Sequence, residues 1–195
     1  MTLSRKMLVS RPGCRHSLSV TSFDENSASG FLRVALAAAS KAAEISRSYY
    51  AGNFTVTTKD DLTPVTQADV ECEQAIREII LTEFPDHGFY GEETGQTQAD
   101  AEYLWLVDPI DGTKGFVRQY PFFSTQIALM HHGEIILGVS SGTMMEELAW
   151  AEKGQGAWLN GCLLYTSPSP RDRHLDLVCR LLLEKGGGGG GGGGG

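Results

Sequence analysis

A short apolar run that ends in two carboxylates constrains the fold more than any other feature of this 195-residue chain. Residues 104–107 read LWLV, and residues 108–113 continue as DPIDGT. Consecutive apolar residues followed by a turn predict a short buried strand. Asp108 and Asp111 would then lie at the end of that strand, where two negative charges are costly to bury unless a positive group meets them. The sequence therefore predicts a sheet in which a buried strand ends at a cation.

The DPIDGT residues suit a hard divalent cation, which prefers carboxylate and carbonyl oxygens as ligands. Pro109 has a fixed φ and restricts Asp108, so the turn is expected to be rigid. Gly112 permits a close approach between the backbone and a ligand, and Thr113 adds a hydroxyl next to the expected metal. A simpler interpretation stays open, because Asp is also a frequent helix cap and Asp108 could serve only as one.

Acidic residues upstream of this strand could complete a metal site. Residues 91–95 read GEETG and follow an expected strand at 87–91. Glu92 is the favoured ligand, and Glu93 is the weaker candidate beside it. The alternative is an exposed acidic loop, which is the commoner setting for such a pair.

A third segment of interest lies further upstream, at residues 59–69. Thr66 and Asp69 fit the capping pattern in which Ser or Thr is followed three residues later by an acid at the start of a helix. Capping alone would explain both residues, so a role for Asp69 in chemistry is an open alternative. Lys59 could meet a phosphate group or simply be solvated.

Apolar residues recur at helical spacing in two segments, which predicts helices at about 30–50 and 67–83. Strands are expected to follow, with a hairpin turn at His132 and Gly133. These strands are predicted at 104–107, 125–130, 135–139, 147–151 and 156–159. Two helices followed by a run of strands favour an α+β layered fold over the alternating strands and helices of a Rossmann fold.

The composition argues against several classes of partner. A net charge of −8 disfavours binding to the backbone of a nucleic acid. No apolar run approaches the length of a membrane span, so we expect no membrane partner. The four cysteines include no CxxC pair and no spacing that suits zinc, which favours a reducing, cytoplasmic setting.

Two sets of residues invite a functional interpretation but have a simpler one. His87, His131 and His132 lie near expected turns, where histidines are more often surface residues than zinc ligands. The three tryptophans are expected to serve packing rather than base stacking; they are Trp105, Trp150 and Trp158.

The chain divides into three parts by composition. Residues 1–28 are rich in Ser and Arg and are expected to form a flexible tail, with a targeting segment as the alternative. Residues 30–161 form the expected domain. Residues 162–195 are expected to be a translated sequencing adapter followed by poly-glycine, because CLLYTSPSPRD and DLVCRLLLEK back-translate, in order and in one frame, to strings that resemble a library adapter.

The order of these segments resembles the inositol monophosphatase family of phosphatases. The likeness covers residues 30–161 and rests on four stretches, which are 59–69, 84–95, 104–116 and 138–161. The resemblance implies a layered α/β sandwich of the inositol monophosphatase type, of which this chain would hold the N-terminal part only. In that part, two helices pack on a largely antiparallel sheet.

The resemblance also implies a cofactor, Mg²⁺, and a ligand set for it. Glu92, Asp108 and the carbonyl of Ile110 would hold a first magnesium ion, and Asp108 and Asp111 would hold a second. In the family, one more Asp ligand lies in a C-terminal half that this sequence does not match. We therefore expect this particular chain to be nearly inactive, although its intact gene would encode an active enzyme.

Roles in catalysis and substrate binding follow from the same resemblance. Asp69 would orient the hydroxyl of Thr113, which helps Glu92 to activate a water molecule. Gly112 and Thr113 would contact the phosphate, and Lys59 lies where the family often has a basic residue.

The expected activity is Mg-dependent hydrolysis of a small phosphate monoester by a metal-activated water. Inositol phosphate or histidinol phosphate is the favoured substrate, a 3'-phosphoadenosine nucleotide is the alternative within the family, and an inactive metal-binding fragment is the alternative outside it. Members of the family often form dimers, so a homodimer of the intact protein is compatible with the resemblance.

Overall fold

A computed structural model describes residues 28–52, 56–58 and 64–164. Lys59 and the segments 1–27 and 165–195 lie outside the described residues, so the predictions made for them stay predictions. The described elements are α1 (Gly30–Tyr50), β1 (Val56–Thr58), β2 (Pro64–Thr66), α2 (Gln67–Glu83), β3 (Gly88–Gly91), β4 (Gly95–Thr97), β5 (Tyr103–Asp111), α3 (Thr113–Val117), β6 (Ser124–His131), β7 (Glu134–Gly142), β8 (Glu147–Glu152), β9 (Gly156–Leu159) and β10 (Cys162–Leu164).

The two long helices occupy the predicted ranges because local signals fix both their faces and their starts. Ser29 caps α1 by accepting a hydrogen bond from the backbone N–H of Leu32 (3.1 Å). Thr66 and Asp69 form a reciprocal capping box at the start of α2. None of the described helices is long and apolar enough to cross a bilayer.

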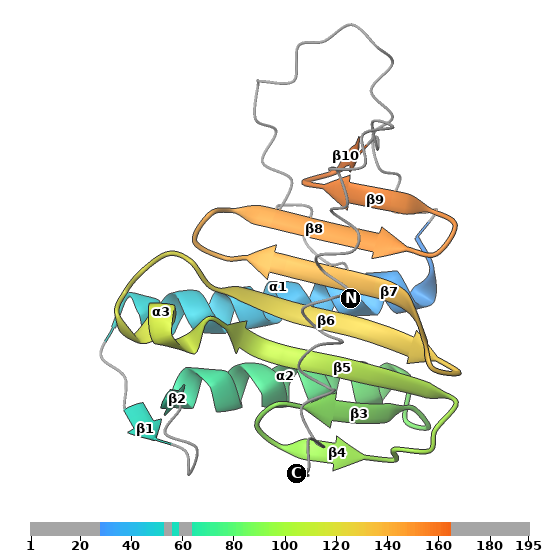
Figure 1. The fold of residues 1–195 in the computed structure, drawn as a ribbon, viewed down its shortest axis with the longest axis horizontal. Coiled ribbons are helices and arrows are strands. Elements are labelled where there is room, and N and C mark those ends of the chain that lie inside the picture. The colour runs from blue at the N-terminus through green and yellow to red at the C-terminus, as the bar shows by residue number, and fades with distance from the viewer. Residues whose placement is uncertain (1–27, 53–55, 59–63, 165–195) are drawn as a thin grey trace, which may run out of the picture.

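Eight of the strands form one sheet, in the order β10-β9-β8-β7-β6-β5-β3-β4. Every neighbouring pair in it is antiparallel except β3 and β5, which are parallel. Both α1 and α2 lie on one face of this sheet, α2 over β5 and α1 over β6 and β7 (Figure 1). The predicted α+β fold, with two helices packed on a largely antiparallel sheet, is confirmed.

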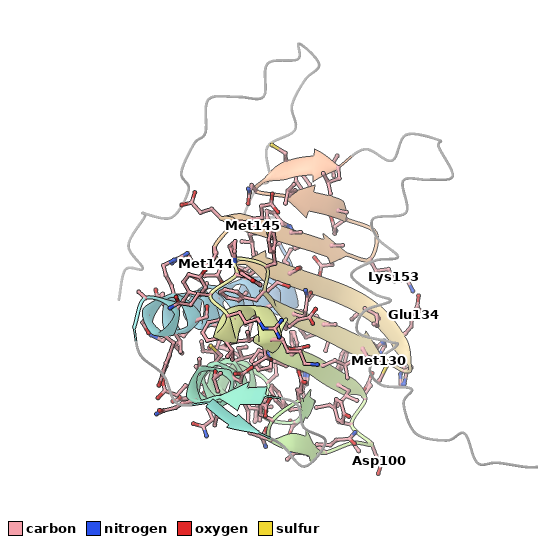
Figure 2. The ribbon with its side chains drawn as sticks, turned by 60° about the vertical axis from the view of Figure 1, so that its left-hand side comes forward. Asp100, Met130, Glu134, Met144, Met145 and Lys153 are labelled. Atoms are coloured by element: carbon pink, nitrogen blue, oxygen red, sulfur yellow. The ribbon has the colours of Figure 1, made fainter. Side chains whose placement is uncertain are left out.

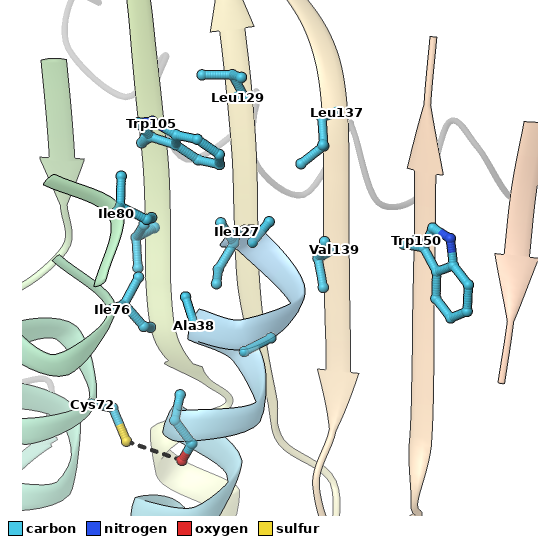
Figure 3. Close-up of a cluster of buried hydrophobic side chains, with 14 of the residues drawn as sticks. Ala38, Cys72, Ile76, Ile80, Trp105, Ile127, Leu129, Leu137, Val139 and Trp150 are labelled. Carbon is cyan, nitrogen blue, oxygen red and sulfur yellow. Dashed lines mark hydrogen bonds between the residues drawn. The ribbon is translucent and has the colours of Figure 1, made fainter. Parts of the chain in front are cut away.

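The core lies between the helix layer and the sheet (Figure 3). Small side chains on α1 allow a close approach to α2, and the thiol of Cys72 donates to the carbonyl of Ala42 (3.5 Å). Trp105 is fully buried beneath the helices. Trp150 is buried as well and stacks on Trp158 with 6.3 Å between ring centroids. The tryptophans therefore serve packing, as predicted.

Candidate active site

The parallel pairing of β3 and β5 brings two predicted ligands to one end of the sheet. Gly91 is the register partner of Val107, so Glu92 and Asp108 leave their strands side by side. The backbone N–H of Glu92 donates to the carbonyl of Val107 (3.2 Å), which ties the two strand ends together. Asp108 is buried and Glu92 is exposed. At this end of the sheet, a solvent-exposed carboxylate therefore lies next to a buried one.

The DPIDGT segment continues β5 as a bulged strand. Asp108 is the register partner of Gln126 and Asp111 that of Ser124, so β5 carries one extra residue over this stretch. The hydroxyl of Thr125 donates to the carbonyl of Pro109 (2.9 Å) and holds the bulge in place. Bulges of this kind redirect a side chain near a site. The interpretation of Asp108 as only a helix cap is wrong, because the residue at the N-cap of α3 is Gly112.

The hydroxyl of Thr113 joins this strand end to α2. Its oxygen lies 3.2 Å from Asp69 Oδ1 and 3.1 Å from the carbonyl oxygen of Ile110. The other carboxylate oxygen of Asp69 accepts from the backbone N–H (2.8 Å) and the hydroxyl (2.5 Å) of Thr66. Asp69 therefore caps its helix and also contacts the DPIDGT segment, while its role in chemistry stays a prediction.

Burial raises the pKa of Asp69, while hydrogen bonds from Thr66 and Thr113 oppose that rise. The carboxyl is 1% exposed, so its charge is stabilised by these hydrogen bonds rather than by water. The same hydrogen bonds to Thr66 and Thr113 hold the Asp69 carboxylate toward the DPIDGT segment.

Gly112 is needed at the turn between β5 and α3 for two reasons. Its φ of 102° is a conformation that side chains with a Cβ rarely adopt. A Cβ at this position would also lie 2.9 Å from the carbonyl oxygen of Phe122. Glycine therefore allows the chain to turn sharply and places Thr113 two residues after the last residue of β5.

Glu73 is a site residue that the sequence interpretation missed. It is fully buried on α2, and its two carboxylate oxygens accept the backbone N–H groups of Glu93 and Thr94 (2.7 Å each). It thereby fixes the loop that carries Glu92. The available signal was its spacing, because Glu73 lies four residues after Asp69 and so shares its helix face.

A different group of side chains meets the geometric requirement for a shared ion. Among the described residues, one set of His, Cys, Asp or Glu side chains has ligand atoms that all lie within 4.8 Å of one another. Its members are Glu102, His131 and His132. They lie at the opposite end of β5 from Asp108. The oxygen donors of the DPIDGT end suit a hard cation such as Mg²⁺, so Glu92, Asp108, Ile110 and Asp111 remain the predicted magnesium ligands.

Comparisons with known proteins agree on a family. The family model for the inositol monophosphatase family matches residues 28–185. A bifunctional phosphatase IMPL2, chloroplastic, of Arabidopsis thaliana is 38% identical over 143 residues, which are 72% of this chain and 41% of that protein. A histidinol-phosphatase of Chlorobaculum parvum is 40% identical over 131 residues, which are 67% of this chain and 51% of that protein.

A solved structure shows the same arrangement of elements. The extragenic suppressor protein suhB from Bartonella henselae superposes with a TM-score of 0.69 at 33% identity, over 72% of this chain and 56% of that one. The chain thus spans about half the length of the relatives it matches. The sequence match, the fold and the arrangement of residues 69, 92 and 108–113 lead to one conclusion, which is that this chain belongs to the inositol monophosphatase family.

Proposed function

We propose that the protein containing this domain hydrolyses a small phosphate monoester with water that a bound magnesium ion activates. The contact between Thr113 and Asp69 carries the proposal. Capping of α2 explains why Asp69 meets Thr66, but it does not require a second contact with a residue 44 positions later in the chain. The second contact is instead expected if Asp69 serves to position the hydroxyl of Thr113 at the end of β5.

The residues at this end would hold the metal through oxygen atoms alone. Glu92, Asp108, Asp111 and the carbonyl of Ile110 are all hard donors, and the family is metal-dependent. A bound divalent ion supplies a water of lowered pKa and offsets negative charge on the phosphoryl oxygens. The identity of the ion as Mg²⁺ is part of the proposal, and the donor chemistry supports it.

The chain's own groups would orient the water and the substrate. A hydroxyl has one hydrogen and two lone pairs, so when Thr113 donates to Asp69 its lone pairs stay available to a water molecule. Glu92 is exposed and lies at the adjacent strand end, where its carboxylate can accept the proton of that water. Gly112, whose backbone carries no Cβ, and Thr113 would contact the phosphate through the turn between β5 and α3.

The substrate class is proposed from the relatives. Those described above are named as a histidinol-phosphatase and a bifunctional phosphatase, and one from Caulobacter vibrioides is named as an inositol-1-monophosphatase. We favour inositol phosphate or histidinol phosphate over a 3'-phosphoadenosine nucleotide. The role of Lys59 in substrate binding, the homodimer and the cytoplasmic location remain predictions.

Phosphate release from these three substrates tests the proposal on a protein that contains the complete family domain. Because a metal contributes several kcal/mol to phosphoryl transfer, we expect Asp108→Asn to lower kcat/KM by about 10²- to 10³-fold. Thr113→Val should lower kcat, whereas Thr113→Ser should largely retain it, since Ser keeps the hydroxyl. Glu134→Gln, which changes an exposed acid elsewhere on the sheet, is the matched control.

Magnesium calorimetry on the 195-residue chain separates the remaining alternatives. Binding that Asp108→Asn weakens, together with phosphate release by the complete domain, supports the proposal. Binding without release from any of the three substrates would instead indicate a non-catalytic metal-binding domain. Phosphate release that persists in EDTA would contradict the metal-dependent mechanism directly.

A further inference from the structure

We propose that Glu102, His131 and His132 form a second metal site, for a borderline divalent ion of the Zn²⁺ class, at the end of the sheet away from Asp108. The ligand atoms of these residues all lie within 4.8 Å of one another. Glu102 Oε1 is 2.9 Å from His131 Nε2 and 3.6 Å from His132 Nε2. Two ligands of one zinc ion, each about 2.0–2.2 Å from it, fall at about such a separation.

The sheet itself brings the three ligands together. Tyr103, which follows Glu102, is the register partner of His131. The backbone N–H of His132 donates to the carbonyl of Glu102 (3.4 Å), so both the backbone and the side chain of Glu102 face the β6–β7 turn. His132 and Gly133 have φ values of 49° and 81°, which suit a tight two-residue turn. The group therefore depends on sheet register and turn geometry and not on flexible loops alone.

A stack of rings orients the most buried of these ligands. His131 stacks on Tyr103 with 4.4 Å between ring centroids, and Tyr103 stacks on His87 at 4.8 Å. His87 in turn accepts a hydrogen bond at Nδ1 from the indole N–H of Trp105 (3.0 Å). Burial lowers the pKa of His87, which favours this neutral acceptor. The ring of His131 is thus held from one side, which reduces the entropy that metal binding would cost.

A cavity of about 350 Å³ lies against two of the ligands. Asp100, Leu104 and Met130 line it together with Glu102 and His132. Figure 2 labels Asp100 and Met130 at this end of the sheet. Three protein ligands leave one tetrahedral position open, and this pocket, open to solvent beside Glu102 and His132, has room for a water molecule or another small ligand.

The chemistry of the donors separates this site from the proposed magnesium site. Imidazole nitrogens suit Zn²⁺ and similar ions, whereas carboxylates and carbonyls suit Mg²⁺. The two ends are also apart, because Tyr103 and Asp108 are five residues distant on one strand, a span of about 16 Å. A surface Glu–His ion pair by itself contributes little to the stability of the fold. Such a pair would also not explain why a second histidine lies beside Glu102.

Zn²⁺ titration of the 195-residue chain in excess Mg²⁺ tests this site. We expect the double variant His131→Gln/His132→Gln to bind one equivalent fewer than the wild type. Glu102→Gln should lower the affinity for that Zn²⁺ ion by tenfold or more. The loss should be at least as large as that caused by removing a group that only hydrogen-bonds to a metal ligand. Glu134→Gln changes an exposed acid on the same hairpin and should leave Zn²⁺ binding unchanged.

Two further measurements make the result decisive. Co²⁺ absorption should show a nitrogen-ligated site in the wild type and lose it in the double variant, while circular dichroism verifies that the variant is folded. Asp108→Asn should keep the Zn²⁺ equivalent, which distinguishes this site from the proposed magnesium site. Equal Zn²⁺ stoichiometry and affinity in the wild type and a folded double variant would overturn the proposal.

Discussion

At the scale of single residues, Glu73 shows how a buried charge can organise a loop. Its carboxylate accepts two backbone N–H groups from the segment after β3. Glu73→Gln leaves one oxygen to accept and turns an NH₂ group toward an N–H donor. We expect the free energy of unfolding to fall by about 1–3 kcal/mol, the cost of a lost hydrogen bond to a charged group or of an unsatisfied buried group. Urea unfolding measures it.

The same substitution should weaken Mg²⁺ binding, because the loop that carries Glu92 loses its anchor. Glu78→Gln, an exposed acid on the same helix, is the matched control and should change neither quantity. Gly91→Ala provides a second route, since a Cβ there would collide with the Glu73 carboxylate. If Glu73→Gln unfolds at the urea concentration of the wild type, the anchoring role is refuted.

At the scale of elements, the sequence predicted what local signals determine. The helices at 30–50 and 67–83 and the β6–β7 hairpin were predicted because apolar spacing, caps and a glycine turn are all local. The parallel pairing of β3 with β5 depends on residues about 16 positions apart and leaves no local mark. The short elements α3 and β4 are too brief to show a period.

The candidate site divides in the same way. Asp108 and Asp111 could be named from sequence because their motif is compact, and Glu92 because the GEETG stretch and the family resemblance indicate it. The contribution of Glu73, and the grouping of Glu102 with two histidines, arise from sheet register and helix packing. The spacing of Glu73 from Asp69 indicates only that they share a helix face, and no pattern along the chain pairs Glu73 with the loop after β3 or Glu102 with the two histidines.

The turn between β5 and α3 should be intolerant of any side chain. Gly112→Ala adds a Cβ where φ is 102° and where the carbonyl oxygen of Phe122 would be 2.9 Å away. Backbone strain of this kind costs about 1–3 kcal/mol, and the contact adds to it, so the midpoint of urea unfolding should fall.

Gly154→Ala is the control that separates strain from collision. Gly154 also has a positive φ, of 81°, but a Cβ there would meet nothing within 4 Å. Its substitution should cost about 1–2 kcal/mol, the typical price of a left-handed residue. An equal loss of stability in both variants would show that the contact between the added Cβ and the carbonyl oxygen of Phe122 contributes nothing beyond the backbone strain.

At the scale of the whole molecule, one helix layer covers one face of the sheet, and the two candidate metal sites lie at opposite ends of β5. The layer closes over Cys72, which is completely buried between α1 and α2. Burial raises the pKa of the Cys72 thiol to about 12, and the nearby charge of Asp69 adds to the rise. Its reactivity should therefore report on the integrity of the entire layer.

Alkylation at pH 8 followed by peptide mass analysis measures that reactivity. Only the thiolate reacts, and a pKa near 12 makes its fraction on the order of 10³-fold smaller than that of an ordinary thiol. We expect Cys72 to stay unmodified in native buffer and to react fully in denaturant, whereas the partly exposed Cys162 reacts in both. Because the thiol is covered by both helices, its labelling requires them to separate, so modification of Cys72 at the rate of Cys162 in native buffer would mean that the layer does not remain closed in solution.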